Sequence, residues 1–236
     1  EQLVDSLFHS AGVPMFSEEL TLDVEGFWPE ETFENYGFPH RAWEFVSTST
    51  ERERASLTLP LVNEIVSLMS VYGWRPNRAE PITERELDPD VFQSGFLANS
   101  SLGLWLFSLS DYSTLTSLAH ETKSVEELVD ELYLRFLTRL PYDQEKTDFV
   151  GFLRRGFERR IIDPEKQFVP IEWIPEIREV SWSNHLSVEA NYHVAEKVER
   201  LLKGPKPTQS LNKDWRERME DVVWVLVNTP EFQYLQ

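Results

Sequence analysis

Two segments with a strict helical spacing of apolar residues constrain the fold of this chain more than any other feature. The first, residues 125–141, repeats apolar residues at intervals of three and four until Pro141 and contains Val125, Leu128, Val129, Leu132, Phe136, Leu137 and Leu140. The second, residues 214–232, keeps the same spacing ahead of Asn228 and Pro230 and contains Trp215, Met219, Val222, Val223, Leu226 and Val227. This spacing places the apolar side chains on one face of a helix. Both segments are therefore predicted to be helices that face the core, and neither carries visible chemistry.

The rest of the chain adds helical patterns and almost none of the alternation that is typical of strands. Helices are predicted over residues 3–8, 59–72, 91–109, 115–119, 143–157 and 187–202, with a kink at 99–103. Two aromatic-rich segments, 14–45 and 163–184, are interrupted by Gly and Pro and are predicted to be irregular, with room for a short strand in 171–180. We therefore expect an all-α protein with seven or eight helices.

The length of 236 residues allows one domain that buries a core without disulfides, and the chain contains no cysteine. We expect a single irregular multi-helix domain with an N-terminal half, 1–112, and a C-terminal helical half, 113–236. The absence of cysteine excludes a thiolate metal site, a cysteine nucleophile and covalent attachment of c-type haem within these residues. Because the chain begins at Glu1 without Met or a basic and apolar leader, we expect it to be part of a longer protein.

The charge of the chain is strongly negative, with 41 acidic and 23 basic residues and a formal net charge of −18. A surface of this charge repels polyanions, so we expect neither nucleic acid nor an anionic membrane surface as a partner. No apolar run approaches the roughly 20 residues that cross a bilayer. We therefore expect no membrane span.

Six phrases that follow one another along the whole chain resemble a known family. They are 1–7 (EQLVDSL), 41–45 (RAWEF), 132–141 (LYLRFLTRLP), 181–187 (SWSNHLS), 214–218 (DWRER), and 224–228 with 230–232 (WVLVN, PEF). Together they resemble the C-terminal planctomycete-specific domain of unknown function, which occurs in large exported bacterial proteins that often also carry planctomycete cytochrome c domains. The resemblance implies a place in the periplasm or cell envelope and a multidomain parent. It assigns no catalytic residue, and any haem c would belong to the parent protein and not to this chain.

His185, Glu189 and His193 are the sharpest candidates for a metal site. They follow one another at intervals of four, which on one continuous helix would bring them onto one face. Imidazole and carboxylate groups are common zinc ligands. The alternative is structural: Ser187 is the expected N-cap of this helix, which would leave His185 outside it.

A second candidate is a surface for a ligand or partner. It combines Trp182, Asn184 and His185 with Arg154 and Arg155, which belong to the basic concentration Arg154, Arg155, Arg159 and Arg160 on the helix after Pro141. The arginines could face the acidic remainder of the same protein, an acidic partner, or a sulfated or carboxylated glycan. The structural alternative makes Trp182 a core anchor, uses Asn184 to satisfy backbone groups and leaves the arginines solvated.

Three other carboxylate clusters are better explained as structural. Calcium-binding loops would need more oxygen ligands than Asp23 with Glu25 or Asp88 with Asp90 provide, so turn and cap roles are favoured. Paired carboxylates can act as the acid and base of a glycosidase. Here they alternate with arginines, which favours a salt-bridged surface or a buried Arg41–Glu44 pair; the cluster consists of Arg41, Glu44, Glu51, Arg52, Glu53 and Arg54.

No phosphate-binding glycine loop, serine elbow or zinc-hydrolase helix occurs in the sequence. We therefore expect a non-catalytic helical domain for interaction or assembly, with no cofactor of its own, whose partners are other domains of its parent or a neighbouring envelope protein. One alternative is a carbohydrate-binding or carbohydrate-active domain, because eight tryptophans offer stacking surfaces. Another is a docking domain for a cytochrome c-type redox partner. Tryptophans that stack on sugars must be open to solvent, whereas core tryptophans are covered.

Overall fold

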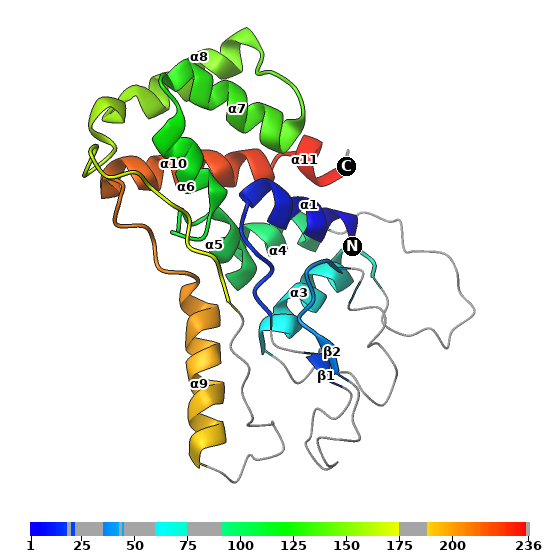
Figure 1. Cartoon of the computed structure of the whole chain (residues 1–236). Helices are drawn as coiled ribbons and strands as arrows, with labels where there is room; N and C mark the ends of the chain where they lie inside the picture. Colours follow the sequence, from blue (N-terminus) through cyan, green and yellow to red (C-terminus); the bar gives the residue numbers. More distant parts are fainter. Residues whose placement is uncertain are drawn as a thin grey trace. The chain divides into compact units, whose positions relative to one another are not determined.

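The computed structural model confirms that the protein is all-α (Figure 1). It describes residues 1–17, 20–21, 35–42, 44, 60–74, 91–174 and 188–234. These residues form ten α-helices and one short antiparallel pair of strands, β1 (Leu20–Thr21) and β2 (Asn35–Gly37). The helix count exceeds the expected seven or eight because the patterns at 91–109 and 214–232 each divide into two helices. None of the helices in the described ranges combines the length and apolarity that a membrane crossing requires.

The chain forms two compact units whose segments alternate along the sequence. The first unit consists of Glu1–Asp5, Met15–Leu102 and Ile174–Gly204, and the second of Ser6–Pro14, Gly103–Trp173 and Pro205–Gln236. Helix α1 (Gln2–Ala11) contributes to both units, as does α5 (Ser101–Phe107). The division into halves at residue 112 stays a prediction.

In the first unit, α3 (Pro60–Val71) contacts α4 (Val91–Asn99) and α9 (Val188–Lys203). The inward face of α3 is fully covered and consists of Val62, Ile65, Leu68 and Met69. Gly73 follows α3 with a φ of 82°, as expected for a glycine that ends a helix. The predicted kink is also confirmed, because α4 ends at Asn99 and α5 begins at Ser101.

The second unit is built around the two periodic segments that dominate the sequence. They form α7 (Val125–Leu137) and α10 (Lys213–Val227), which contact each other, α8 (Asp143–Arg154) and α11 (Pro230–Tyr234). Their stripes meet in a core of Leu128, Leu132, Phe136, Trp215, Met219, Val223 and Leu226, all at most 2% exposed. The second unit also contains α6 (Thr114–Glu121), the 3-10 helix η3 (Phe157–Arg159) and parts of α1 and α5. The two stripes are therefore complementary halves of one core.

The start of α7 agrees with the prediction, whereas the C-terminal ends of α7 and α8 differ from it. Ser124 caps α7 by accepting a hydrogen bond from the Glu127 amide at 3.1 Å, as predicted. However, α7 ends at Leu137 because Thr138 adopts a left-handed conformation with a φ of 56°. The prediction that the stripe continues to Leu140 is therefore wrong, and Leu140 is 57% exposed. Similarly, α8 ends at Arg154 and not near Phe157, since Gly156 has a φ of 90° and separates α8 from η3.

Candidate functional site

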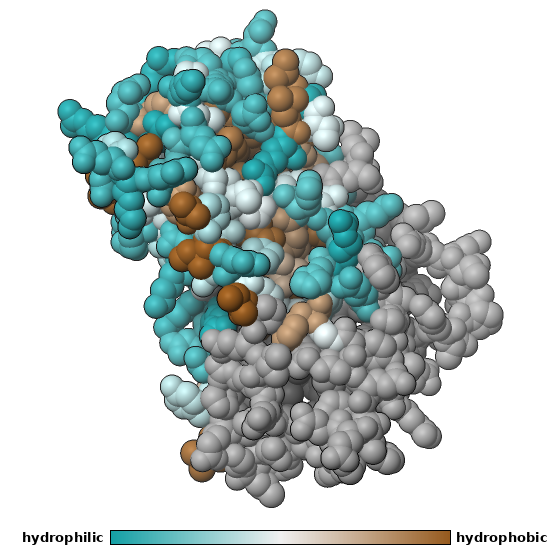
Figure 2. Space-filling view, viewed as in Figure 1, coloured by the Kyte–Doolittle hydropathy of each residue, from teal (hydrophilic) through white to brown (hydrophobic). Residues whose placement is uncertain are grey.

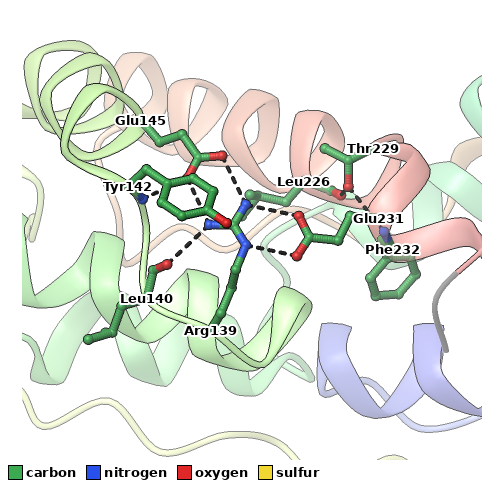
Figure 3. A network of polar contacts seen from close by, with 8 residues as sticks. All are labelled: Arg139, Leu140, Tyr142, Glu145, Leu226, Thr229, Glu231 and Phe232. Carbon is green, nitrogen blue, oxygen red and sulfur yellow. Dashed lines mark hydrogen bonds and ion pairs between the residues drawn. The ribbon is translucent and has the colours of Figure 1, made fainter.

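Arg139, in the turn between α7 and α8, binds two carboxylates in a bidentate manner (Figure 3). Its Nε and Nη2 donate to Glu231 at 2.8 and 2.9 Å, and its Nη1 and Nη2 donate to Glu145 at 2.8 and 2.9 Å. The fifth donor reaches the carbonyl of Leu140 at 3.1 Å. Glu145 lies in the first turn of α8 and Glu231 in the first turn of α11, where negative charge is favoured by the helix dipole. The guanidinium therefore joins the ends of three helices.

Aromatic rings and helix caps complete this arginine cluster. The guanidinium of Arg139 lies 4.4 Å from the ring centre of Tyr142 and 5.3 Å from that of Tyr133. Glu145 also accepts a hydrogen bond from the Tyr142 amide at 2.8 Å, which caps α8. Thr229 caps α11 by accepting from the Phe232 amide at 3.2 Å (Figure 3). Glu145 therefore both binds Arg139 and caps α8, whereas the cap of α11 is supplied by Thr229, two residues before Glu231.

The electrostatics of the arginine cluster keep its acids charged. Hydrogen bonds from Arg139 lower the pKa of Glu145 and of Glu231 below the ordinary value. Burial, followed by the charge of Glu145, raises the pKa of Tyr133 to about 12. None of these shifts brings a group close to proton exchange at neutral pH. The chemistry of this cluster is that of a structural cross-link.

A histidine and two hydroxyl groups form a second polar cluster. His120, in the last turn of α6, has its Nε2 2.9 Å from the Oγ of Ser210, which lies 2.8 Å from the Oγ1 of Thr208. The imidazole stacks on Phe168 with ring centres 4.8 Å apart and planes 9° apart. Burial, followed by the charge of Arg160, lowers the pKa of His120. A histidine beside a serine is the simplest pair that can activate a hydroxyl nucleophile, and a third group normally orients the imidazole.

Arg160 lies in the interior and does not belong to the predicted basic surface. It donates to the carbonyls of Ala119 and Thr122, both at 2.6 Å, and to that of Phe157 at 3.0 Å. Its guanidinium also stacks over the Phe157 ring at 3.8 Å. The prediction placed Arg160 with the solvated arginines because sequence spacing does not show that the last carbonyls of α6 need donors. Burial lowers the pKa of Arg160, which nevertheless remains a cation at neutral pH.

The other arginines of that group are on the surface. Arg154 pairs with Glu126 of α7, and Arg155 and Arg159 are exposed. An open groove of about 570 Å³ separates the start of α7 from α8 and is lined by Glu126, Asp143, Lys146, Thr147, Val150, Gly151 and Arg154. Its charges are largely paired, since Lys146 binds Asp130 at 2.6 Å. The structure thus places Arg154 beside a groove whose walls carry both signs of charge.

Most other predicted site residues lie outside the described residues. This applies to Trp182, Asn184, His185, the two proposed calcium loops and the charged run 51–54. Glu189 and His193 fall within α9, but their side chains are not described. In the described ranges, no three His, Asp or Glu side chains are arranged to hold a metal ion. Arg41 is exposed, and Glu44 accepts hydrogen bonds from the amides of His40 and Arg41.

The described tryptophans differ in exposure. Trp105 and Trp215 are core residues, and Trp215 donates from its indole to the carbonyl of Leu153 at 3.0 Å. Trp74 donates to the carboxylate of Glu1 at 3.0 Å. Trp224, on α10, is 42% exposed. By the criterion of solvent exposure, Trp105 and Trp215 are core residues, and Trp224 is open enough to contact a ligand.

No protein-family model, curated protein or solved structure matches this chain. The arginine cluster and the pair formed by His120 and Ser210 were both missed by sequence reasoning. Arg139 and Glu231 are 92 residues apart, and His120 and Ser210 are 90 residues apart. The only sequence signal was that Arg139 lies between a helix end and a proline. Spacing alone does not identify such pairs.

Proposed function

We propose that this protein is a helical interaction domain whose second unit binds a partner protein through the segment 161–171. The single observation that carries this proposal is the exposure of three large apolar side chains on this one segment. Ile162 is 62% exposed, Val169 is 69% exposed and Ile171 is 53% exposed. Figure 2 shows hydrophobic side chains lying among hydrophilic ones on the surface of the described residues.

The segment is held in place although it has no regular secondary structure. Phe168 stacks on His120, the Ile171 amide donates to the carbonyl of Asp111 at 2.8 Å, and the Ile162 amide donates to that of Ser210 at 3.0 Å. A surface that is already ordered loses less conformational entropy when it binds. Exposed apolar groups that are fixed in this way favour association with another protein. The sequence resemblance supports, as candidates, other domains of a multidomain envelope protein.

Site-specific photo-crosslinking in the full-length parent protein, in its native cells, tests this proposal. A photoreactive residue at Val169 should give a discrete crosslinked product, and one at Glu158, which is exposed and charged, serves as the control. The product from position 169 should be lost when Ile171 is replaced by Asp. Equal products at both positions, or a product that survives Ile171→Asp, would contradict the proposal.

The carbohydrate-binding alternative is supported by one observation, the half-exposed ring of Trp224 on α10. Aromatic rings that are open to solvent can stack on sugar faces. Titration with soluble acidic and neutral polysaccharides should then change tryptophan fluorescence in the intact chain and not in the Trp224→Phe variant. The described residues add no observation in favour of the redox-docking alternative.

A further inference from the structure

The segment Ile174–Gly204 of the first unit interrupts the sequence of the second unit, and the two stretches that flank this segment belong to the second unit. The chain leaves the second unit after Trp173 and returns to it at Pro205. We call residues 161–173 the outgoing connector and residues 205–211 the returning connector. Both connectors are attached to the second unit by backbone hydrogen bonds, from the Ile171 amide to the Asp111 carbonyl and from the Thr208 amide to the Leu109 carbonyl, each 2.8 Å long.

His120 contacts both connectors with its one imidazole ring. The face of the ring stacks on Phe168 of the outgoing connector, and its Nε2 lies 2.9 Å from the Oγ of Ser210 in the returning connector. These two contacting groups are uncharged. His120, a single titratable side chain on α6, therefore contacts both connectors.

Three charged groups act on His120. Arg160, which follows η3, disfavours the protonated imidazole, whereas Asp111 ahead of α6 and Glu121 within α6 favour it. The donors of Arg160 are directed at the carbonyls of Ala119, Thr122 and Phe157, and the nearby carboxylate whose charge favours the Arg160 cation is that of Glu158. Protonating His120 would place a second cation beside this buried guanidinium.

We propose that His120 is a pH-sensitive clamp whose protonation loosens the attachment of both connectors to the second unit. We call the arrangement in which His120 contacts both connectors closed, and the one in which these contacts are broken open. In the closed arrangement, burial and the charge of Arg160 lower the pKa of His120 from its ordinary value of 6.5. Opening exposes the imidazole and returns its pKa toward that value, so the open arrangement binds the proton more tightly. Acidification below about pH 6.5 therefore favours opening.

Hydrogen exchange of the whole chain at pH 5.5 and 7.5, corrected for intrinsic rates, tests the clamp. The amides of Ile171 and Thr208 should lose protection at pH 5.5, while amides within α7 keep theirs. In the His120→Gln variant the protection of both connectors should be the same at both pH values. His9→Gln, which replaces an exposed histidine on α1, should behave like the parent chain.

A second measurement keeps the proposal testable if His120→Gln does not fold. The pKa of His120 in the unaltered chain can be read from the pH dependence of its ring proton resonances, assigned against the His9→Gln spectrum and the remaining histidines. A value below 6.5 together with acid-induced loss of connector protection supports the clamp. A value at or above 6.5, or connector protection that does not depend on pH, would overturn it.

Discussion

Replacing Arg139 by Met should destabilise the second unit by about 2–4 kcal/mol. The substitution keeps a long side chain and removes all five hydrogen bonds to Glu145, Glu231 and Leu140. Breaking a buried ion pair costs about 3–5 kcal/mol, and an exposed pair is worth up to about 1 kcal/mol. The Arg139 side chain is 23% exposed and its partners are 32% and 33% exposed, so the expected cost lies between these limits.

Urea unfolding, followed by the fluorescence of the tryptophans, measures this free energy. Arg154→Met is the matched control, because Arg154 forms one ion pair with Glu126 and is 63% exposed. We expect the control to cost at most about 1 kcal/mol. Arg139→Lys should recover only part of the loss, since an ammonium group cannot bind two carboxylates in a bidentate manner. Equal midpoints for Arg139→Met and Arg154→Met would refute the view that the arginine cluster joins the three helices.

The pH dependence provides an independent check of the same reasoning. Because Arg139 lowers the pKa of Glu145 and Glu231 in the folded state, its stabilisation is present above their ordinary value of 4.5 and is lost as the pH falls through their lowered values. The difference in stability between the parent chain and Arg139→Met should therefore be constant near neutral pH and shrink below about pH 4. A difference that grows on acidification would contradict this assignment.

Four further substitutions test packing. Gly12→Ala should destabilise by more than about 1 kcal/mol in thermal unfolding, because Gly12 has a φ of 60° and a Cβ there would lie 1.8 Å from the Thr114 hydroxyl. Gly151→Ala should instead raise the melting temperature by stabilising α8 by about 1 kcal/mol, since, apart from the adjoining residues and the nearby backbone of α8 itself, no atom lies within 4 Å of the added Cβ. Trp215→Phe should cost about 1–3 kcal/mol in urea unfolding because it removes the donor to a buried carbonyl, whereas Trp224→Phe should cost less than about 0.5 kcal/mol.

The sequence predicted the parts of the fold that depend on short-range order. The apolar stripes, the Ser124 cap and the glycine stop at Gly73 each follow from neighbours within one or two helical turns. The end of α7 was mispredicted because Thr138 adopts a left-handed conformation, which is uncommon for a residue that is not glycine. The prediction instead ended this helix at Pro141, three residues after Thr138, which is later than the structure shows.

The polar clusters depended on long-range order and were therefore not predictable from spacing. Arg160 looked like a member of a basic surface because it follows Arg154, Arg155 and Arg159. Its position was decided by unpaired carbonyls at the end of α6, about 40 residues earlier in the chain. The same holds for His120, whose partner Ser210 lies 90 residues away. A single sequence carries no periodic signal for such contacts.

The hydrogen bonds of three arginines in the second unit affect which partners this unit favours. Arg139 is held by two carboxylates, and Arg160 and Arg135 donate to carbonyls, with Arg135 reaching that of Ser10. These cations stabilise helix ends and are not available to an acidic partner. Association through Ile162, Val169 and Ile171 should therefore change little between low and moderate salt, as expected for an apolar contact. Crosslinking from position 169 at both salt concentrations measures this, and loss of the product at moderate salt would show that charge, and not apolar contact, holds the partner.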